Sequence, residues 1–310
     1  MILTVTPNPC VDKTVFIDEL KVGTFIRAPR YTCIPGGKGT NVSRAVKILG
    51  RETKALVIVG GHTGAHVVEM IREQDGVEPV PVWVQSPTRT ITTVLEEPIH
   101  RQTAFFEPGS RVSPTEHANI AEQFTEAVKN ARVVTFNGTV SDPAINHLYR
   151  ELIRIAQDFG ALTILDSHGP EFAQGLEAVP HMVKPNVAET EELVKYSLAT
   201  TEAKWRAIDW YHERGVTLVV LSLGKDGALV SQGTERFHVI PPTIKEVNPV
   251  GSGDALVAAF AIGLMENQPL REMAVLGVAA GTANAMSWDI GHFTRAEVEK
   301  LAQEVRVVPV

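Results

Sequence analysis

Apolar, strand-like runs alternate with helical patterns over most of the 310 residues, and this alternation constrains the fold more than any other feature. Short apolar runs bounded by turn residues predict strands, whereas apolar residues spaced three and four apart predict helices. The expected strands cover residues 2–6, 55–59, 80–84, 133–136, 162–166, 182–184, 218–223 and 228–231. The expected helices cover residues 41–49, 64–74, 114–129, 143–159, 188–196, 201–214, 254–265, 270–287 and 295–305. Such alternation predicts an α/β fold, with helices on both faces of a largely parallel sheet.

Two segments, residues 15–34 and 88–106, break this alternation. Both carry threonine, valine and phenylalanine without a helical face, and residues 90–95 alternate partly with the period of a strand. We expect a few antiparallel strands outside the main sheet, and the pattern alone leaves open a lid or ordinary edge hairpins. No stretch has the composition of a linker between domains, so we expect one domain over residues 1–310.

Charge and composition exclude several classes of protein. The formal net charge of −7 argues against a generic basic surface for nucleic acid or for an anionic membrane. Any site for an anion must therefore be built locally. No apolar run reaches the roughly 18 residues of a membrane-spanning helix, so none is expected. Residues 1–6 lack the basic and long apolar regions of a signal peptide, and we expect a cytoplasmic protein.

Cysteine and histidine usage predicts neither disulfides nor structural zinc. Cys10 and Cys33 are the only cysteines, too few for a disulfide framework or a four-ligand zinc site. The ten histidines show no grouping with a cysteine, so no structural zinc site is expected from the sequence.

Residues 247–254, Val-Asn-Pro-Val-Gly-Ser-Gly-Asp, lead directly into an alanine-rich apolar run that predicts a buried helix. Pro249 disfavours helical backbone at the residue before it, so the small residues predict a turn with Asp254 at or near the helix start. The free N–H groups and the dipole of such a start attract phosphate, and Asp254 beside it could take a proton from an attacking hydroxyl. A simple helix cap fits the same pattern, because Asp and Gly-x-Gly are common there.

Residues 34–43, Ile-Pro-Gly-Gly-Lys-Gly-Thr-Asn-Val-Ser, form a second glycine-rich stretch. The glycines allow the backbone to approach a ligand closely, Lys38 supplies a mobile cation, and Asn41 can donate and accept hydrogen bonds. The stretch is not a Walker A loop, because glycine rather than serine or threonine follows Lys38. A glycine-rich turn with a solvated lysine is the alternative.

Charged residues near the first strand and the two irregular segments are candidates for binding a sugar phosphate. Asp12 could accept two sugar hydroxyls, or it could cap a turn. Arg27, Lys38 and Arg89 lie on or beside the irregular segments. Convergence of these cations in an acidic protein would indicate an anionic substrate, because arginine binds phosphate through two parallel hydrogen bonds. Taken singly, each is an ordinary surface charge.

Two later stretches are candidates for a nucleotide site. Lys184, Asn186 and Glu189 lie at the end of a strand and the start of a helix. The lysine could reach a nucleotide phosphate, while Asn186 and Glu189 could hold Mg²⁺ directly or through water. The same asparagine and glutamate have the spacing of a capping box, which is the alternative. Residues 221–227 predict a strand and a glycine-bounded turn, which is either a wall of the nucleotide site or a plain hairpin.

Taken together, these stretches resemble the PfkB (ribokinase-like) family of carbohydrate kinases over essentially the whole chain. The most specific parts are Gly-Gly-Lys-Gly-Thr-Asn-Val-Ser-Arg-Ala at 36–45 and the stretch at 247–254. Asn-Pro-Cys-Val-Asp at 8–12, Ser-Pro-Thr-Arg at 86–89, Lys-Pro-Asn-Val-Ala-Glu at 184–189 and Ser-Leu-Gly-Lys-Asp-Gly at 222–227 follow the family's order. The chain is most similar to the branch acting on phosphorylated hexoses, which includes 1-phosphofructokinase, tagatose-6-phosphate kinase and the minor 6-phosphofructokinase.

The resemblance implies a three-layer α/β/α fold with a mostly parallel central sheet and a small β-sheet lid. The lid would be built from residues 13–35 and 87–107. The implied reaction is transfer of a phosphoryl group from ATP, with Mg²⁺, to a hydroxyl of fructose 1-phosphate, tagatose 6-phosphate or fructose 6-phosphate. A homodimer formed through the lid is also implied.

The resemblance also implies a role for individual residues. Asp254 would be the base, and the backbone of Gly251, Ser252 and Gly253 would bind the transferring phosphoryl group. The sugar would contact Asp12, Gly36, Gly37, Asn41 and Thr139, and its phosphate would contact Arg27, Lys38 and Arg89. The ATP site would include Lys184, Asn186, Ser222, Gly224, Gly227 and Asn284. Glu189, with Asn186, would help to hold Mg²⁺.

Two departures from the family's pattern leave the sugar open. Asn-Gly-Thr at 137–139 stands where Ser-Gly-Ser or Ser-Gly-Thr is usual, and His168 stands where a small residue is typical. Two other functions are weighed against the leading one. A family kinase of an unphosphorylated sugar or nucleoside is disfavoured by the three cations, and a non-catalytic sugar-phosphate binder is disfavoured by Asp254 in its intact turn.

Overall fold

The larger of two sheets forms the centre of the molecule in the computed structural model, which describes residues 1–310. Its ten strands lie in the order β14-β13-β12-β11-β10-β9-β8-β1-β4-β5. Their bounds are β1 Ile2–Thr6, β4 Thr53–Val59, β5 Glu78–Trp83, β8 Val133–Asn137, β9 Leu162–Asp166, β10 Met182–Val183, β11 Leu218–Ser222, β12 Ala228–Gln232, β13 Glu235–Ile240 and β14 Arg306–Pro309. The strands from β5 to β11 run parallel, and the rest form an antiparallel ribbon. The predicted, largely parallel sheet is confirmed, although the sequence pattern missed β13 and β14.

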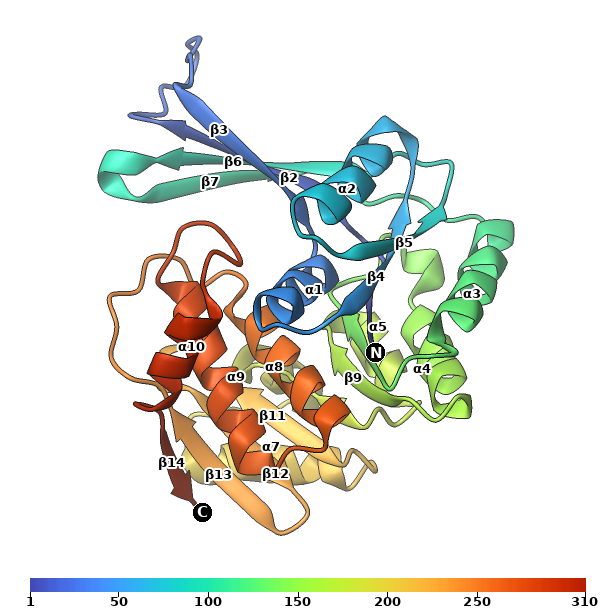
Figure 1. Cartoon of the computed structure of the whole chain (residues 1–310), viewed down its shortest axis with the longest axis vertical. Coiled ribbons are helices and arrows are strands. Elements are labelled where there is room, and N and C mark those ends of the chain that lie inside the picture. Colours follow the sequence, from blue (N-terminus) through green and yellow to red (C-terminus); the bar gives the residue numbers. More distant parts are fainter.

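Helices cover both faces of this sheet (Figure 1). They are α1 Lys38–Ile48, α2 Gly61–Glu73, α3 Pro114–Val128, α4 Leu148–Asp158, α5 Gly169–Leu176, α6 Val187–Val194, α7 Thr201–His212, α8 Ser252–Glu266, α9 Leu270–Ala285 and α10 Arg295–Ala302. Side chains alternate between the faces of a strand. Ile2 therefore packs with α1, α8, α9 and α10, whereas Leu3 packs with α3, α4, α5 and α7. None of the helices is long and apolar enough to cross a membrane.

Two stretches of helix differ from the sequence prediction. The helix expected at 143–159 is divided into a 3₁₀ turn at Pro143–Ile145 and α4, which begins at Leu148. Asp142 fixes this break, because its carboxylate accepts hydrogen bonds from the amides of Ala144 and Val112. The pattern also missed α5, whose two turns contain glycine and proline near the start and bury Phe172 and Leu176.

The four strands of the smaller sheet, called the lid below, are β2 Cys10–Ile17, β3 Arg30–Gly36, β6 Arg89–Glu96 and β7 Arg101–Phe106, in the order β3-β2-β6-β7. Figure 1 shows the lid extending beyond the body of the molecule. The outer pairs are antiparallel, as expected, but β2 and β6 are parallel. This corrects the prediction of purely antiparallel strands. The local pattern could not reveal it, because β2 and β6 are distant in the sequence.

Candidate active site

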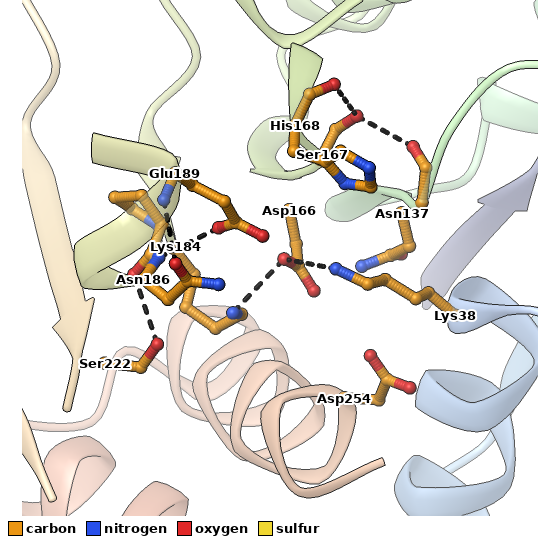
Figure 2. Close-up of polar contacts among 12 residues, drawn as sticks. Lys38, Asn137, Asp166, Ser167, His168, Lys184, Asn186, Glu189, Ser222 and Asp254 are labelled. Atoms are coloured by element: carbon orange, nitrogen blue, oxygen red, sulfur yellow. Dashed lines mark hydrogen bonds and ion pairs between the residues drawn. The ribbon is translucent and has the colours of Figure 1, made fainter. Parts of the chain in front are cut away.

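Four neighbouring parallel strands end in polar residues at one edge of the central sheet. Asn137 and Asp166 are the last residues of β8 and β9, Lys184 directly follows β10, and Ser222 ends β11. Ligands of parallel sheets bind beyond this edge. Figure 2 shows these side chains grouped together with Lys38 and Asp254, which come from the helices above the edge.

Asp166 holds two lysines at the centre of this group. Its Oδ1 lies 3.2 Å from Nζ of Lys184 and 3.4 Å from Nζ of Lys38, and its side chain is fully buried. Burial alone raises the pKa of Asp166, but the ammonium groups of Lys184 and then Lys38 outweigh it and hold that pKa below its usual range. The carboxylate therefore stays ionised and fixes both cations. The sequence interpretation gave Asp166 no role, although its place at the end of a parallel strand is a signal that could have suggested one.

The predicted turn before Asp254 is present and forms the start of α8. Gly251 precedes the helix with φ 86°, in the left-handed region, and a side chain there would lie 2.5 Å from Ile290. The helix begins at Ser252 rather than at Asp254. No acceptor within the chain bonds to the amides of Gly253 and Asp254. These free N–H groups at a helix start suit a phosphoryl group.

The second glycine-rich stretch forms the start of α1, beside that of α8. Gly37 precedes the helix with φ 119°, and a side chain there would lie 2.6 Å from Thr6. Nδ2 of Asn41 donates to Oδ2 of Asp254 at 2.8 Å, and its Oδ1 accepts from Arg44 at 3.1 Å. Asn41 therefore orients Asp254 in this structure, whereas the resemblance assigned it to sugar hydroxyls.

Burial raises the pKa of Asp254 to about 6, and neighbouring Asp166 adds to the effect. Lys38, the hydrogen bond from Asn41 and Lys184 act in the opposite direction and keep the rise limited. Asp254 is thus largely ionised at pH 7, as is required of a base, and it is a stronger base than an exposed aspartate. The charge of Asp166, and then those of Asp254 and Glu189, raise the pKa of Lys38, so that this lysine stays charged.

The three cations expected to bind phosphate are not brought together within one chain. Arg27 is exposed on the loop between β2 and β3 and forms no ion pair or hydrogen bond. Lys38 is paired with Asp166 and faces the carboxylate of Asp254 instead. Arg89 donates from Nη2 to the carbonyl of Asn8 at 3.3 Å, and its Nε is buried without a partner. Arg89 is therefore the one of the three with an unused, buried donor.

Asp12 lies beside these groups on β2. Burial raises the pKa of its carboxyl, while the positive charges of Arg44 and Arg89 lower it and only partly offset the rise. Gly36 pairs with Cys10 across β2 and β3, and a side chain at Gly36 would lie 2.8 Å from Cβ of Asp12. Glycine at position 36 therefore allows β3 to pack closely against β2 at Asp12.

Asn186 and Glu189 do form the capping box of α6. Each side chain accepts the amide of the other residue, at 2.9 Å in both cases. Only Oε2 of Glu189 is used in this bond, and Oδ2 of Asp166 is buried without any partner. Two carboxylate oxygens at one site are the type of ligand that Mg²⁺ prefers. The donor set therefore fits Mg²⁺ through Asp166 and Glu189, and the side-chain oxygen of Asn186 is already committed to the helix.

The turn after β11 has the expected form. Ser222 donates from Oγ to the carbonyl of Pro185, and the amide of Gly227 donates to the carbonyl of Gly224. Asn284 differs from its expected place against a nucleotide, because its amide is buried and fully engaged. It donates to the carbonyl of Val250 and to Oγ of Ser252, and it accepts from Gly291. Its part is to hold the turn before α8.

The unusual 137–139 stretch leaves an unsatisfied amide in the site. Both Oδ1 and Nδ2 of Asn137 are buried and have no partner, although such groups are nearly always bonded in folded proteins. The hydroxyl of Tyr149 lies 3.0 and 2.8 Å from the carbonyls of Asn137 and Gly138 and fixes this loop. Thr139 is half-buried and forms no hydrogen bond within the chain.

Comparison with known proteins identifies the family. Residues 5–287 match the pfkB family of carbohydrate kinases. The chain belongs to this family. It is similar to tagatose-6-phosphate kinases from two strains of Staphylococcus epidermidis, with 29% identity over 321 residues and 30% over 325 residues, each covering 100% of both chains.

Solved structures with phosphofructokinase in their names have the same fold. Phosphofructokinase-2 from Escherichia coli in complex with fructose-6-phosphate is 29% identical, with a TM-score of 0.88 over 98% of both chains. A putative phosphofructokinase from Staphylococcus aureus is 28% identical, with a TM-score of 0.85 over 100% of this chain and 99% of the other. The protein therefore has the ribokinase-like fold, a three-layer α/β/α body with a lid. The two most specific PfkB stretches of this chain are those that form the adjoining starts of α1 and α8.

Proposed function

We propose that this PfkB kinase transfers a phosphoryl group from ATP to a hydroxyl of a phosphorylated ketohexose. The observation that carries the proposal is the setting of Asp254. It is a buried carboxylate with a pKa raised to about 6, it lies on the first turn of α8 beside two free amides, and Lys38 stands opposite. A base needs a pKa near the working pH and a place next to the group that it deprotonates.

The roles of the residues follow from these contacts. Asp254 accepts the proton of the attacking hydroxyl while Asn41 keeps its carboxylate in place. The amides of Gly253 and Asp254 bind the phosphoryl oxygens at the positive end of the helix. Lys38 and Lys184, fixed by Asp166, supply positive charge. Because the transition state of phosphoryl transfer is loose, positioning and neutralisation of this kind account for most of the catalysis.

Asp166 and Glu189 would hold Mg²⁺ through the oxygens that the protein itself leaves free. When bound, Mg²⁺ supplies charge that neutralises the phosphates of ATP. Lys184, Ser222 and the turn that ends at Gly227 would form the wall of the ATP site on the same side.

Arg89 and Asp12 would select the sugar phosphate. The buried, unused Nε of Arg89 is a donor for the phosphate that the sugar already carries. Asp12 would accept sugar hydroxyls beside the glycines Gly36 and Gly37. Curated relatives are named tagatose-6-phosphate kinase, so tagatose 6-phosphate is the first candidate, with fructose 6-phosphate and fructose 1-phosphate next.

The lid supports a further part of this proposal, a single kinase domain over residues 1–310 that pairs with a second copy. Its exposed apolar side chains include Phe25, Tyr31, Ile99, Phe105 and Phe106. An apolar surface of this kind usually marks an interface. A homodimer through the lid (residues 13–35 and 87–107) would cover it and bring Arg27 near a second chain. A cytoplasmic location stays a prediction.

Release of ADP in the presence of Mg-ATP tests the proposal. The panel comprises tagatose 6-phosphate, fructose 6-phosphate, fructose 1-phosphate, free fructose and ribose, with the Asp254→Asn variant as the blank. Turnover confined to phosphorylated ketohexoses is expected. Turnover on free sugars alone would contradict the assignment of Arg89, and no turnover on any member would favour a non-catalytic binding protein.

A further inference from the structure

A group of metal-binding side chains lies outside the active site, where α3 meets the start of α4. It consists of His117 on the first turn of α3, His147 just before α4, and Glu151 one turn later. Their ligand atoms all lie within 4.8 Å of one another. In a tetrahedral zinc site with bonds of about 2.0–2.1 Å, ligand atoms are about 3.3 Å apart. The widest of these separations must therefore close by roughly 1.5 Å for all three side chains to bind one ion.

The helices hold the three side chains in place. The amide of Glu151 donates to the carbonyl of His147 at 3.2 Å, so these two residues lie on the same face of α4. The rings of His117 and His147 lie 4.8 Å apart, centre to centre. Each side chain is half-buried, which leaves a path for an ion from solvent.

One atom of the group is poorly satisfied without a ligand. Nε2 of His117 is buried and forms no hydrogen bond of acceptable geometry, although it lies 3.0 Å from Oε2 of Glu151. A buried nitrogen of this kind normally has a partner. An ion pair between His117 and Glu151 would explain the short distance between Nε2 and Oε2. It would not explain why these two atoms are poorly aligned for a hydrogen bond. A metal ion bound by both side chains explains the two observations together.

We propose that His117, His147 and Glu151 form a zinc-binding site. Two imidazoles and one carboxylate are a ligand set that zinc accepts, with a fourth position open to water. The nearby acids cannot fill that position. Glu116 caps α3 and binds the amide of Gln85, while both oxygens of Asp142 accept backbone amides. The sequence spacing did not reveal the site, because its third ligand lies 30 residues before His147.

A metal ion here would join α3 to the segment that leads to the active site. Tyr149, on the first turn of α4, lies next to the carbonyls of Asn137 and Gly138 at the edge of the central sheet. Fixing the start of α4 therefore stabilises the loop between this edge and α4. We assign zinc a structural role, since none of the three ligands touches the candidate catalytic residues.

The test is a zinc titration of chelator-treated, full-length protein against a chromophoric competitor, with thermal melting in parallel. The variants are His117→Ala and Glu151→Gln, and the matched control is His181→Ala. His181 is half-buried like the proposed ligands, lies just before β10, and belongs to no group of metal-binding side chains. We expect one zinc ion per chain, a rise in Tm with added zinc, and an affinity at least about 10-fold weaker in both ligand variants. The control should match the wild type.

Two results would overturn the proposal. One is equal zinc affinity in the wild type, His117→Ala and Glu151→Gln, because the active-site carboxylates would then account for all binding. The other is an equal loss in His181→Ala. Melting curves without metal establish that each variant is folded. If His117→Ala does not fold, the near-isosteric Glu151→Gln decides, and unchanged affinity in that variant counts against the site.

Discussion

The edge of the central sheet and the lid differ in which side chains they bury and which they expose. At the sheet edge, Asp166, Lys184 and Asp254 are almost completely buried and engage one another or Lys38. On the lid, aromatic side chains such as Phe25 and Phe106 are exposed, and the ion pair of Arg30 with Glu97 lies in solvent. The charged side chains at the sheet edge are thus buried in the body of the molecule, whereas the apolar side chains on the outside of the lid are exposed.

The difference shows how each region achieves its function. Buried charges interact strongly because water does not screen them, and removal of one member leaves its partners unpaired at a large cost. Exposed pairs contribute little by themselves. The sheet edge can therefore be preorganised by the chain alone. Under the proposed function, the lid would instead depend on two partners, a sugar phosphate on its inner side and a second copy of the chain on its outer side.

Asp254→Asn should have the largest effect on activity. Asparagine keeps the shape and can still accept the hydrogen bond from Asn41, but it cannot take a proton. We expect a fall in kcat of about 10²–10⁴-fold, the usual contribution of a general base. Steady-state ADP release measures this, and the far-UV spectrum confirms the fold. Turnover within a few-fold of the wild type would remove Asp254 from the role of base.

Asp166→Asn should be the most damaging change to stability. It leaves Lys184 and Lys38 buried without their carboxylate, and loss of one partner of a buried pair costs about 3–5 kcal/mol. The matched control is Glu97→Gln on the lid, which breaks an exposed pair worth less than about 1 kcal/mol. Urea unfolding of both variants measures the difference. Similar losses in the two would show that the sheet edge and the lid do not differ in the way described here.

The pH dependence should report the raised pKa of Asp254. Below a pH of about 6, the pKa of Asp254, protonation removes the base, so kcat/KM should fall about tenfold for each pH unit. Stability changes with pH in the opposite direction. Because the pKa of Asp254 is raised in the folded state, its protonation favours folding at low pH, and its ionisation lowers the free energy of unfolding above pH 6. Asp254→Asn removes that cost and should melt higher than the wild type at pH 7. A kcat/KM that stays level down to pH 4.5 would contradict this.

The local features of the fold and site were predictable, whereas the pairings between distant residues were not. Three features depend only on residues close together in the sequence, and all are present in the structure. They are the turn before Asp254, the capping box at Asn186 and the alternation of strands and helices. The place of Lys38 against Asp166 depends on residues 128 positions apart. No local pattern could show that Lys38 pairs with Asp166.

Asn41 and Asn284 also show that the partner of a side chain is hard to predict from sequence. The sequence placed each near a ligand, and the structure places both near the site but bonded to protein groups, Asp254 and the turn before α8. A family resemblance predicts which part of the molecule a residue lies in more reliably than it predicts which group its side chain bonds to. Parallel pairing of β2 with β6 was missed for the same reason, since it is set by the whole topology.

A substitution on the lid surface should change the stability of the chain least, but it should clearly change dimer formation. Phe105→Asp changes an exposed side chain, so the free energy of unfolding of the isolated chain should change by less than about 0.5 kcal/mol. A charge in an apolar interface should nevertheless shift a dimer toward monomer. Light scattering over a range of concentrations measures this. A wild type that is monomeric at all concentrations would contradict the proposed dimer.

The most direct test of the division between sheet edge and lid is the ratio of kcat/KM for tagatose 6-phosphate to that for free tagatose. Arg89→Ala should lower this ratio by about 10–100-fold, the value of a hydrogen bond to a charged group. Arg30→Ala, which removes an exposed lid arginine, should leave it unchanged, and Asp254→Asn should lower both rates together. An unchanged ratio in Arg89→Ala would contradict the account, because the lid would then not recognise the phosphate.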